Sequence, residues 1–329
     1  MSDALTTPEK LVQMVIAVAI FYGVVALILL ATQRLRSRSG ERVQSAAFLG
    51  PSLLLIGIGL LYPAGVTIYD SFFGGSVFTK EFVAFDNYQR LFTDSNQLEV
   101  LRNTLFWVVL TPLLSTAIGL LYAVLVDRAS FEKFAKALLF LPMAISMVGA
   151  SIIWKFVYDF RSGQGSETVQ IGLLNQVLQW LGLEPYNFLL NGPWNTLFLI
   201  VILVWIQAGF AMTLLSASIK AIPEDIVEAA RLDGVSGWKM FRHITVPSIR
   251  PTLIVVLTTI TIATLKVFDI VQTATGGNFG TSVLAYEFYR QYFIAGNQGL
   301  AAAIAVVIFV LVMPIVVYNV RQMRKLEAR

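Results

Sequence analysis

The sequence has no cysteine, a single histidine and few charged residues. Without cysteine the chain can form neither a disulfide bridge nor a thiolate site, and the lone His243 leaves no cluster of ligands for a transition metal. We therefore expect no metal and no cofactor. Only 13% of the 329 residues are charged, whereas 57% are hydrophobic. This composition excludes a soluble domain built around one core.

The uncharged runs predict membrane-spanning helices. A helix needs about 17 to 25 apolar residues to cross a hydrocarbon core that is about 30 Å thick. Six uncharged stretches reach this length: 11–33, 43–69, 103–126, 137–154, 185–219 and 291–320. A seventh predicted span, 251–273, is interrupted by Lys266 and Asp269. The predicted fold is therefore all-α, a polytopic membrane protein with seven transmembrane helices.

The positive charges predict the orientation of these helices, because Lys and Arg are retained in cytoplasmic loops. Most of them follow the first, third and fifth predicted spans or lie in the C-terminal tail: Arg34, Arg36, Arg38, Arg42, Arg128, Lys133, Lys136, Lys220, Arg231, Lys239, Arg242, Arg250, Arg321, Arg324, Lys325 and Arg329. The N-terminus is thus predicted outside and the C-terminus in the cytoplasm. The net charge of +4 has the same origin, so no nucleic-acid partner is expected.

The sequence carries no sign of catalysis. It contains no phosphate-binding motif of the form GxxxxGK[ST], so ATP hydrolysis by this route would have to come from a partner chain. No histidine, cysteine or pair of carboxylates falls at predicted membrane depth, which argues against a membrane-embedded enzyme. We expect a non-catalytic protein.

One polar block, 220–251, interrupts the apolar sequence on the predicted cytoplasmic side. Pro223 suits the start of a helix, and Glu228 is one of three acidic residues that would stabilise the positive N-terminal turns of that helix. Asp233-Gly234 predicts a turn, and a second short helix is expected over 236–243, capped by its serine. The block is therefore predicted to form a helix-turn-helix at the membrane surface.

This block carries a family resemblance. Its fixed positions are Glu228, Ala229, Ala230, Gly234, Ile244, Val246 and Pro247. The pattern resembles the EAA loop of binding-protein-dependent ABC importers, of the carbohydrate-uptake, MalF-like branch. The resemblance implies a six-helix permease core over 43–329, with 1–42 as an accessory helix and basic loop. It also implies that a cytoplasmic ATPase binds the loop through Glu228, Ala229, Ala230, Asp233, Gly234, Ile244 and Pro247.

The same resemblance nominates a sugar path in the helices on either side of the loop. Polar and aromatic side chains within spans are costly unless they face protein or water. Counting back from the EAA glutamate places sugar-contacting positions at Trp205, Gln207 and Phe210, and counting back from Gly276-Gly277 places others at Thr259 and Ala263. The charges of Lys266 and Asp269 are further candidates. Lys266 and Asp269 are expected to share one helical face. Packing within the membrane is the alternative role for Trp205, and back-bonding to its own helix the alternative for Thr259.

Three further sequence segments add to the resemblance. Residues 82–88 resemble an F-x-G-x-x-N-Y phrase of sugar permeases, with Ala84 in place of glycine, and 171–183 predict a short amphipathic helix. Residues 265–281 resemble α-glucoside (AglF-like) permeases. The implied function is therefore ATP-driven import of a di- or oligosaccharide with α-linkages across a bacterial or archaeal inner membrane. Implied partners are a second homologous permease, two ATPase subunits, an extracytoplasmic solute-binding protein, the sugar and membrane lipid.

An ion- or proton-coupled secondary sugar transporter is the alternative function. Such a transporter needs an intramembrane carboxylate relay. Within the predicted spans only Asp269 could contribute to one. The sequence therefore favours the ATP-driven importer.

Overall fold

The computed structural model describes residues 12–16, 18–19, 22–23, 26, 45, 49–75, 80–127, 130–162 and 170–327. The chain forms two compact units, Met1–Tyr69 and Asp70–Arg329, which are described separately. The helix Leu49–Asp70 begins in the first unit, ends one residue into the second and is apolar enough to span a membrane. It contains a π-helical turn, η1 (Gly57–Leu61), followed by α3 (Tyr62–Asp70).

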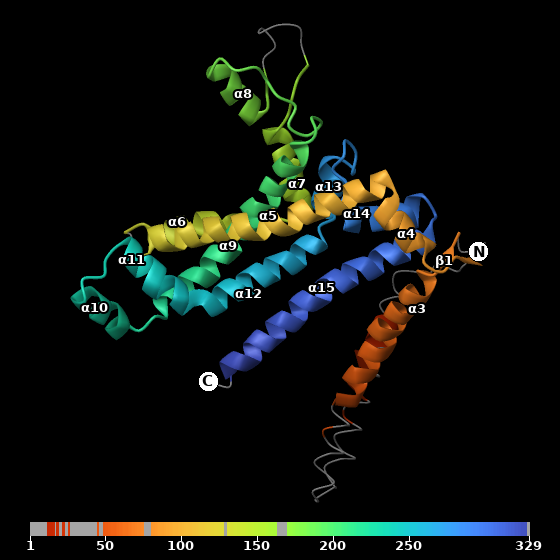
Figure 1. Ribbon diagram of the computed structural model, residues 1–329, viewed down its shortest axis with the longest axis horizontal. Helices are drawn as coiled ribbons and strands as arrows, with labels where there is room; N and C mark the ends of the chain where they lie inside the picture. The colour runs from red at the N-terminus through yellow and green to blue at the C-terminus, as the bar shows by residue number, and fades with distance from the viewer. Residues whose placement is uncertain are drawn as a thin grey trace, which may run out of the picture. The chain divides into compact units, whose positions relative to one another are not determined.

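The second unit is mostly helical (Figure 1). Its elements are β1 (Phe73–Gly74), β2 (Glu81–Phe82), α4 (Asp86–Thr93), α5 (Ser95–Val126), α6 (Glu132–Phe140), η2 (Leu141–Ala144), α7 (Met147–Val157), α8 (Leu173–Trp180), α9 (Asn195–Lys220), α10 (Glu224–Leu232), α11 (Trp238–Met240), η3 (Phe241–Thr245), α12 (Val246–Leu265), α13 (Asp269–Ala274), α14 (Leu284–Tyr289), η4 (Arg290–Ile294) and α15 (Gln298–Glu327). The two-residue strands pair antiparallel with Phe73 opposite Phe82 and are a small addition to the helical fold that the sequence predicts.

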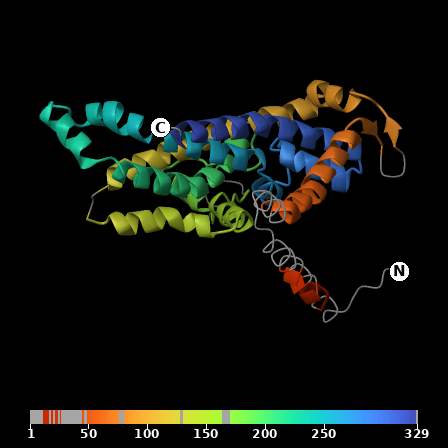
Figure 2. The ribbon, with the colours of Figure 1, turned by 90° about the horizontal axis from the view of Figure 1, so that it is seen from below.

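Helices α5, α9 and α12 pack against one another and form the centre of the second unit, and α15 packs against α12 (Figures 1 and 2). Small residues allow the close approach of α5 and α9: a Cβ added at Gly119 would lie 2.6 Å from the Cβ of Ala211. Likewise, a Cβ at Gly209 would lie 2.2 Å from the carbonyl oxygen of Leu139, on the other side of α9. Such small-residue contacts are typical of helices packed in membranes.

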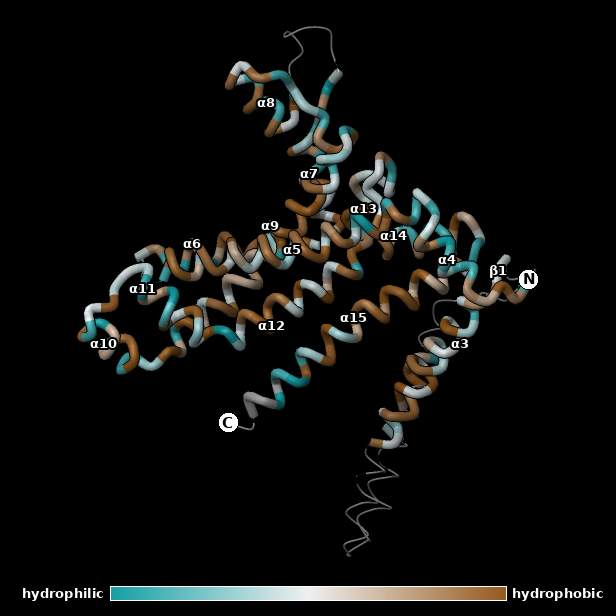
Figure 3. The backbone as a smooth tube through the Cα atoms, in the orientation of Figure 1, coloured by the Kyte–Doolittle hydropathy of each residue, from teal (hydrophilic) through white to brown (hydrophobic). Residues whose placement is uncertain are grey.

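Five described helices are long and apolar enough to cross a membrane: Leu49–Asp70, Ser95–Val126, Asn195–Lys220, Trp238–Leu265 and Gln298–Gln322. The hydrophobic lengths of α5, α9 and α12 are visible in Figure 3, where hydrophilic residues mark the C-terminal end of α15 and the region of α10 and α11. A sixth span arises if the bent pair Glu132–Ala144 and Met147–Val157 is counted as one. The first predicted span, 11–33, lies largely outside the described residues.

The predicted span 137–154 is broken in the structure. Its two helical parts meet at an angle of 106°. The short 3-10 turn η2 contains Pro142, and Ser146 then caps α7 by accepting a hydrogen bond from the Gly149 N–H at 3.1 Å. Proline and a serine cap are both signals for a helix boundary. The uncharged run therefore indicated a membrane segment but not its shape.

The predicted helix 251–273 was wrong at both ends. The helix already begins at Trp238, because α11, the π-helical turn η3 and α12 are continuous, and it ends at Leu265. Lys266 is its C-cap, and a new helix, α13, begins at Asp269. The two charges therefore lie at a helix break and do not share one helical face, and the described residues show no ion pair between them.

Candidate functional site

The polar block between α9 and α12 forms the predicted helix-turn-helix. Helix α10 starts after Pro223, which takes the N-cap position with an extended backbone (φ −54°, ψ 134°). Glu224 and Asp225 occupy the first turn, where negative charge stabilises the helix dipole. We call residues 220–251 the coupling hairpin; α10 and α11 lie beyond the ends of the long helices α9 and α12 (Figure 1).

Gly234 ends α10 in a left-handed conformation with φ of 75°. The N–H of Gly234 donates to the carbonyl of Arg231 at 3.0 Å, and the N–H of Val235 donates to the carbonyl of Ala230 at 2.9 Å. This pair of bonds is the Schellman arrangement, in which a glycine with positive φ satisfies the last carbonyls of a helix. The predicted turn at Asp233-Gly234 is thus confirmed, and it explains the glycine before any partner is considered.

The returning arm of the hairpin differs from the prediction. Gly237, not Ser236, is the N-cap of α11, with φ of 53° and ψ of −121°. The helix does not stop at His243 but continues through η3 into α12. Ile244 lies in the π-helical turn, and Pro247 follows it inside the same continuous helix. The hairpin is therefore joined to α12 without a loop.

The coupling hairpin exposes an unusual mixture of side chains. Glu228 and Ala229 are exposed, and Glu228 forms no ion pair with any residue that the structure describes. Two large apolar side chains are exposed beside them, Leu232 at 88% and Trp238 at 70%. Ala230, by contrast, is buried. Exposed apolar groups next to an available carboxylate are the features of a protein-binding surface.

Helix α9 distributes its three candidate sugar-contacting residues over two faces. Trp205 is half-buried and its ring meets that of Trp154 on α7 edge-on, with centroids 5.9 Å apart. Gln207 lies about 200° further round the helix, and Phe210 lies on the same side as Gln207. Phe210 packs against the core cluster that includes Ile260 of α12. This chain alone therefore does not bring Trp205, Gln207 and Phe210 together in one binding site.

The candidates on and after α12 are more accessible. Thr259 and Lys266 are exposed, whereas Ala263 and Asp269 are half-buried. Thr259 and Ala263 are four residues apart, so they lie on one face of α12. Three other threonines of α12 bond back to their own helix: Thr258, Thr261 and Thr264 donate to the carbonyls four residues earlier at 2.8, 2.7 and 2.7 Å.

Sequence reasoning missed a network of buried amides that holds the loop between α13 and α14. In this loop Gly276, Gly277 and Gly280 have positive φ. Asn103 of α5 donates to the carbonyls of Gly280 at 2.6 Å and Ser282 at 3.0 Å, and Asn195 of α9 donates to the carbonyl of Phe279 at 2.7 Å. The glycines were visible in the sequence, but the distant asparagines carried no local signal.

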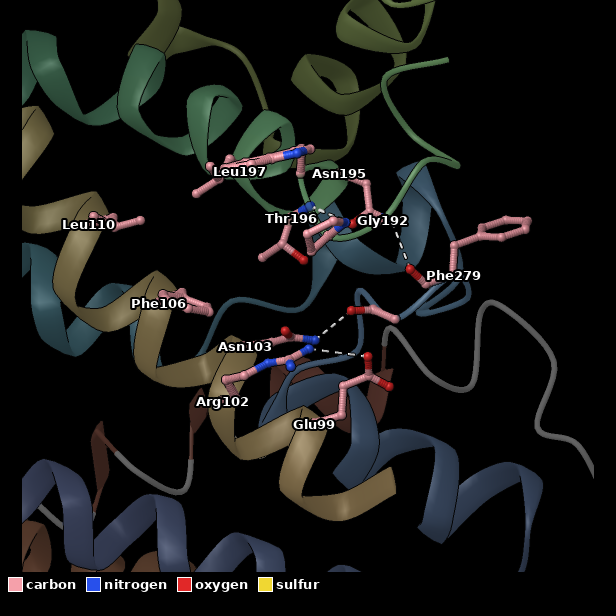
Figure 4. A pocket seen from close by; sticks show the side chains of 13 residues that line it. Glu99, Arg102, Asn103, Phe106, Leu110, Gly192, Asn195, Thr196, Leu197 and Phe279 are labelled. Carbon is pink, nitrogen blue, oxygen red and sulfur yellow. Dashed lines mark hydrogen bonds and ion pairs between the residues drawn. The ribbon is translucent and has the colours of Figure 1, made fainter. Parts of the chain in front are cut away.

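This network borders a cavity of about 650 Å³ between the first turns of α5 and α9 (Figure 4). Glu99, Arg102 and Asn103 line it from α5, and Glu99 and Arg102 form an ion pair of 3.4 Å. Phe106 and Leu197 contribute apolar walls. Aromatic and polar side chains line the cavity. Its two charged side chains, Glu99 and Arg102, are paired with each other.

Glu287 is a second missed residue. Its carboxylate is fully buried, yet it accepts bonds from Arg290 (2.8 Å to each oxygen), Gln291 (2.7 Å) and Gln97 (2.9 Å). Burial alone would raise the pKa of Glu287, but the bonds from Arg290, Gln291 and Gln97 outweigh it and leave the pKa below its usual value. This charged cluster joins α14 to the start of α5.

The phrase at 82–88 has a structural explanation. Ala84 has φ of 49°, a left-handed conformation that glycine adopts without strain. Asn87 is buried and donates to the carbonyls of Ser71 and Phe73, each at 2.9 Å. The hydroxyls of Tyr88 and Ser71 share a 2.7 Å bond. Residues 82–88 therefore hold the β1–β2 hairpin against α4.

The short helix predicted within 171–183 is confirmed, because α8 (Leu173–Trp180) lies in this range.

This chain is similar in sequence to several known transport proteins. The permease GgtC of Synechocystis sp., named for uptake of osmoprotective compounds, is 45% identical over 280 residues, which cover 85% of this chain and 99% of the relative. The α-glucoside permease AglF of Rhizobium meliloti is 45% identical over 285 residues, or 86% of this chain and 83% of the relative.

A more distant relative, the trehalose/maltose permease MalF of Thermococcus litoralis, is 32% identical over 272 residues and covers 80% of this chain and 88% of the relative. The crystal structure of a bacterial ABC transporter for the polysaccharide alginate contains a chain with the same fold. Its TM-score is 0.72 at 23% identity, and the match covers 88% of this chain and 99% of that one. Residues 100–325 match the model of the binding-protein-dependent transport system inner membrane component family, and this chain belongs to that family.

Proposed function

We propose that this chain forms half of the translocation path of an ATP-driven importer for an α-linked di- or oligosaccharide. As a permease subunit the chain is itself non-catalytic. A second homologous permease would supply the other half of the path. Two cytoplasmic ATPase subunits would supply the energy, and an extracytoplasmic solute-binding protein would deliver the sugar. The whole assembly would sit in the inner membrane among its lipids.

The coupling hairpin carries this proposal. Glu228, Leu232 and Trp238 offer one exposed carboxylate and two exposed apolar side chains to a partner. Because α11 continues into α12 and only 221–223 separate α9 from α10, a force on the hairpin would act directly on two spans. In this proposal Glu228, Ala229, Ala230, Asp233, Gly234, Ile244 and Pro247 form the ATPase-binding region.

Orientation and span number follow from the same proposal. A cytoplasmic ATPase requires the coupling hairpin inside, which agrees with the distribution of Lys and Arg. We propose seven transmembrane helices, with the N-terminus outside and the C-terminus in the cytoplasm. Residues 43–329 would form the permease core and 1–42 an accessory helix. Labelling of single-cysteine variants by an impermeant maleimide on intact cells tests this topology, because the chain has no cysteine of its own.

The sugar path would be lined by Trp205, Gln207, Phe210, Thr259, Ala263, Lys266 and Asp269. An indole face packs well on the apolar face of a pyranose, and amides and hydroxyls bond its hydroxyl groups. Trp205 and Gln207 lie on different faces of α9, so one sugar would meet both only in a cavity that the second permease completes. The partner would therefore share in the choice of substrate.

The substrate class rests on relatives. AglF is named for α-glucosides and the Thermococcus litoralis relative for trehalose and maltose, which are α-linked glucosides. GgtC, equally similar at 45% identity, is named for osmoprotective compounds, which makes an osmoprotective solute the second candidate. Binding assays on the cognate solute-binding protein with α-glucosides and non-sugar osmolytes distinguish them. Binding of non-sugar osmolytes alone would overturn the sugar assignment.

ATP dependence tests the function itself. In proteoliposomes that hold the complete transporter and the binding protein, sugar uptake should require internal ATP and should persist when a proton uncoupler is added at constant ATP. A proton-coupled secondary transporter would show the opposite behaviour: uptake without ATP and collapse with the uncoupler.

A further inference from the structure

A second cavity, of about 480 Å³, lies where α6 begins and α9 ends. Its lining includes three lysines, Lys133 and Lys136 from α6 and Lys220 from α9, and none of its lining residues is a carboxylate. Helices α6 and α9 pack side by side, so the ammonium groups converge from two elements that are far apart in the sequence. Lys220 is also the first residue of the coupling hairpin, but none of the lining residues belongs to the proposed sugar path or to the proposed ATPase-binding residues.

The three lysines around this cavity differ in their ion-pair partners among the described residues. One carboxylate oxygen of Glu132 accepts hydrogen bonds from both Lys136 and Lys220, at 2.5 Å each, and Asp127 lies 3.9 Å from Lys220. Lys136 also donates to the hydroxyl of Ser216. Lys133 is exposed and enters no ion pair with any residue that the structure describes. Lys136 and Lys220 are thus held by Glu132, whereas Lys133 has no carboxylate partner among the described residues and can bind an anion.

Apart from the hydroxyls of Thr213 and Ser216, the rest of the lining is apolar and lies on one side of the lysines along the helices. Ala137 and Phe140 follow the lysines along α6, and Ala217 precedes Lys220 by about one turn of α9. Because α6 begins at Glu132 and α9 ends at Lys220, these apolar residues lie toward the middle of the membrane and the lysines toward its surface. The cavity is therefore amphipathic, with positive charge at its surface end only.

We propose that this cavity binds an anionic phospholipid of the leaflet that faces the coupling hairpin. The lipid phosphate would lie between Lys133 and the Lys136–Lys220 pair, and an acyl chain would cover Phe140 and Ala217. Basic pockets between membrane helices suit phosphate headgroups, and each nearby lysine strengthens their attraction. A free phosphate ion shares the headgroup chemistry but gains nothing from the apolar wall, so the lipid is the better fit.

The position of the cavity gives the lipid a structural consequence. Lys220 is the last residue of α9, and α10 begins four residues later at Glu224. A phosphate that competes with Glu132 for Lys220 would act at the root of the coupling hairpin. The site is independent of which sugar is transported, so it does not depend on the proposed substrate.

Lipid binding to the assembled, delipidated transporter in detergent tests the proposal. Phosphatidylglycerol and phosphatidylcholine are titrated separately, and bound lipid is counted by native mass spectrometry. We expect phosphatidylglycerol to bind at one saturable site per permease, phosphatidylcholine to bind much more weakly, and excess inorganic phosphate not to displace the lipid. Displacement of the lipid by phosphate would show that the cavity is a simple anion site. Absence of phosphatidylglycerol binding would show that the cavity does not take an anionic lipid and would point to a protein segment as its occupant. Either result overturns the proposal.

Two variants and one control locate the site. Lys133→Gln removes an exposed charge and should weaken phosphatidylglycerol binding about fivefold. Ala217→Leu fills the apolar part without changing charge and should also weaken it. Arg321→Gln removes an exposed positive charge at the C-terminal end of α15 and should leave binding unchanged. Equal losses in Lys133→Gln and Arg321→Gln, or normal binding in Ala217→Leu, would show diffuse surface attraction and contradict a built site.

Discussion

The backbone N–H of Val235 donates to the carbonyl of Ala230 at 2.9 Å and closes the end of α10 around Gly234, whose φ is 75°. The glycine therefore has two possible reasons to be there. Glycine adopts the left-handed conformation of the turn without strain, and its lack of a side chain would let a partner approach the backbone closely. Beyond Gly234 and its two neighbours in the chain, no described atom lies within 4 Å of the position that a Cβ would take, so a side chain there would meet no other described residue.

Two substitutions of Gly234 separate these reasons. Gly234→Ala adds little bulk but strains the turn by about 1 kcal/mol. Gly234→Asn tolerates the left-handed conformation but adds a larger side chain. If the ATPase approaches this backbone closely, Gly234→Asn should lose more sugar-stimulated ATPase activity than Gly234→Ala, at equal abundance in the membrane. The reverse order would mean that the turn, not the docking, requires glycine.

Ala84 predicts a stabilising substitution. Its φ of 49° costs an alanine about 1 kcal/mol relative to its favoured conformations, and glycine avoids this strain. Ala84→Gly should therefore raise the melting temperature of the purified protein. Ala295→Gly is the control for the change from alanine to glycine, because Ala295 has an ordinary φ of −84°. It should lower the melting temperature or leave it unchanged; a decrease for Ala84→Gly would contradict the strained turn.

Glu287 predicts loss of stability in acid. Its pKa is lower in the folded protein than in the unfolded chain, where a glutamate titrates at about 4.3. The stabilisation is therefore complete above that value and is lost as the pH falls through the folded-state pKa. Glu287→Gln should melt earlier than the parent protein at neutral pH. The difference between the two melting temperatures should shrink below about pH 4; parallel curves at every pH would rule out this contribution.

Trp205 distinguishes sugar contact from packing. Trp205→Ala should raise the KM of transport about two- to tenfold, the equivalent of about 0.5–1.5 kcal/mol of aromatic contact. Trp205→Phe, which keeps a ring against Trp154, should restore most of the affinity. If the indole only packs against Trp154, both variants would lower the amount of folded protein and leave the KM unchanged.

The coupling hairpin was predictable because its signals are local. Pro223, the acidic first turn and Asp233-Gly234 specify a helix start and a helix end within a dozen residues. The uncharged runs likewise located the described spans, because crossing a membrane depends mainly on length and apolar composition. The resemblance of 228–247 to the EAA loop supplied the family, which composition alone could not.

What was missed depends on contacts between distant residues. The break after Leu265 and the bend between α6 and α7 carried local signals, Lys266 and Pro142, but span length and apolar composition alone do not distinguish a broken helix from a continuous one. Asn103 meets the loop at Gly280 across 177 positions of sequence, and Gln97 meets Glu287 across 190. A periodic pattern cannot indicate such pairs. The continuous helix from Trp238 also escaped prediction, because Pro247 and Pro251 resemble boundaries although both lie inside it.

Cross-linking of the coupling hairpin to the ATPase tests the central claim most directly. The chain has no cysteine, so Leu232→Cys introduces a unique thiol at a side chain that is 88% exposed. In the assembled transporter, with single cysteines placed in the ATPase, a short bifunctional maleimide should join the two chains. A control thiol at the outer residue Trp180, also exposed, should not cross-link. No cross-link from Leu232→Cys to any ATPase position, in a transporter that still imports sugar, would contradict the account.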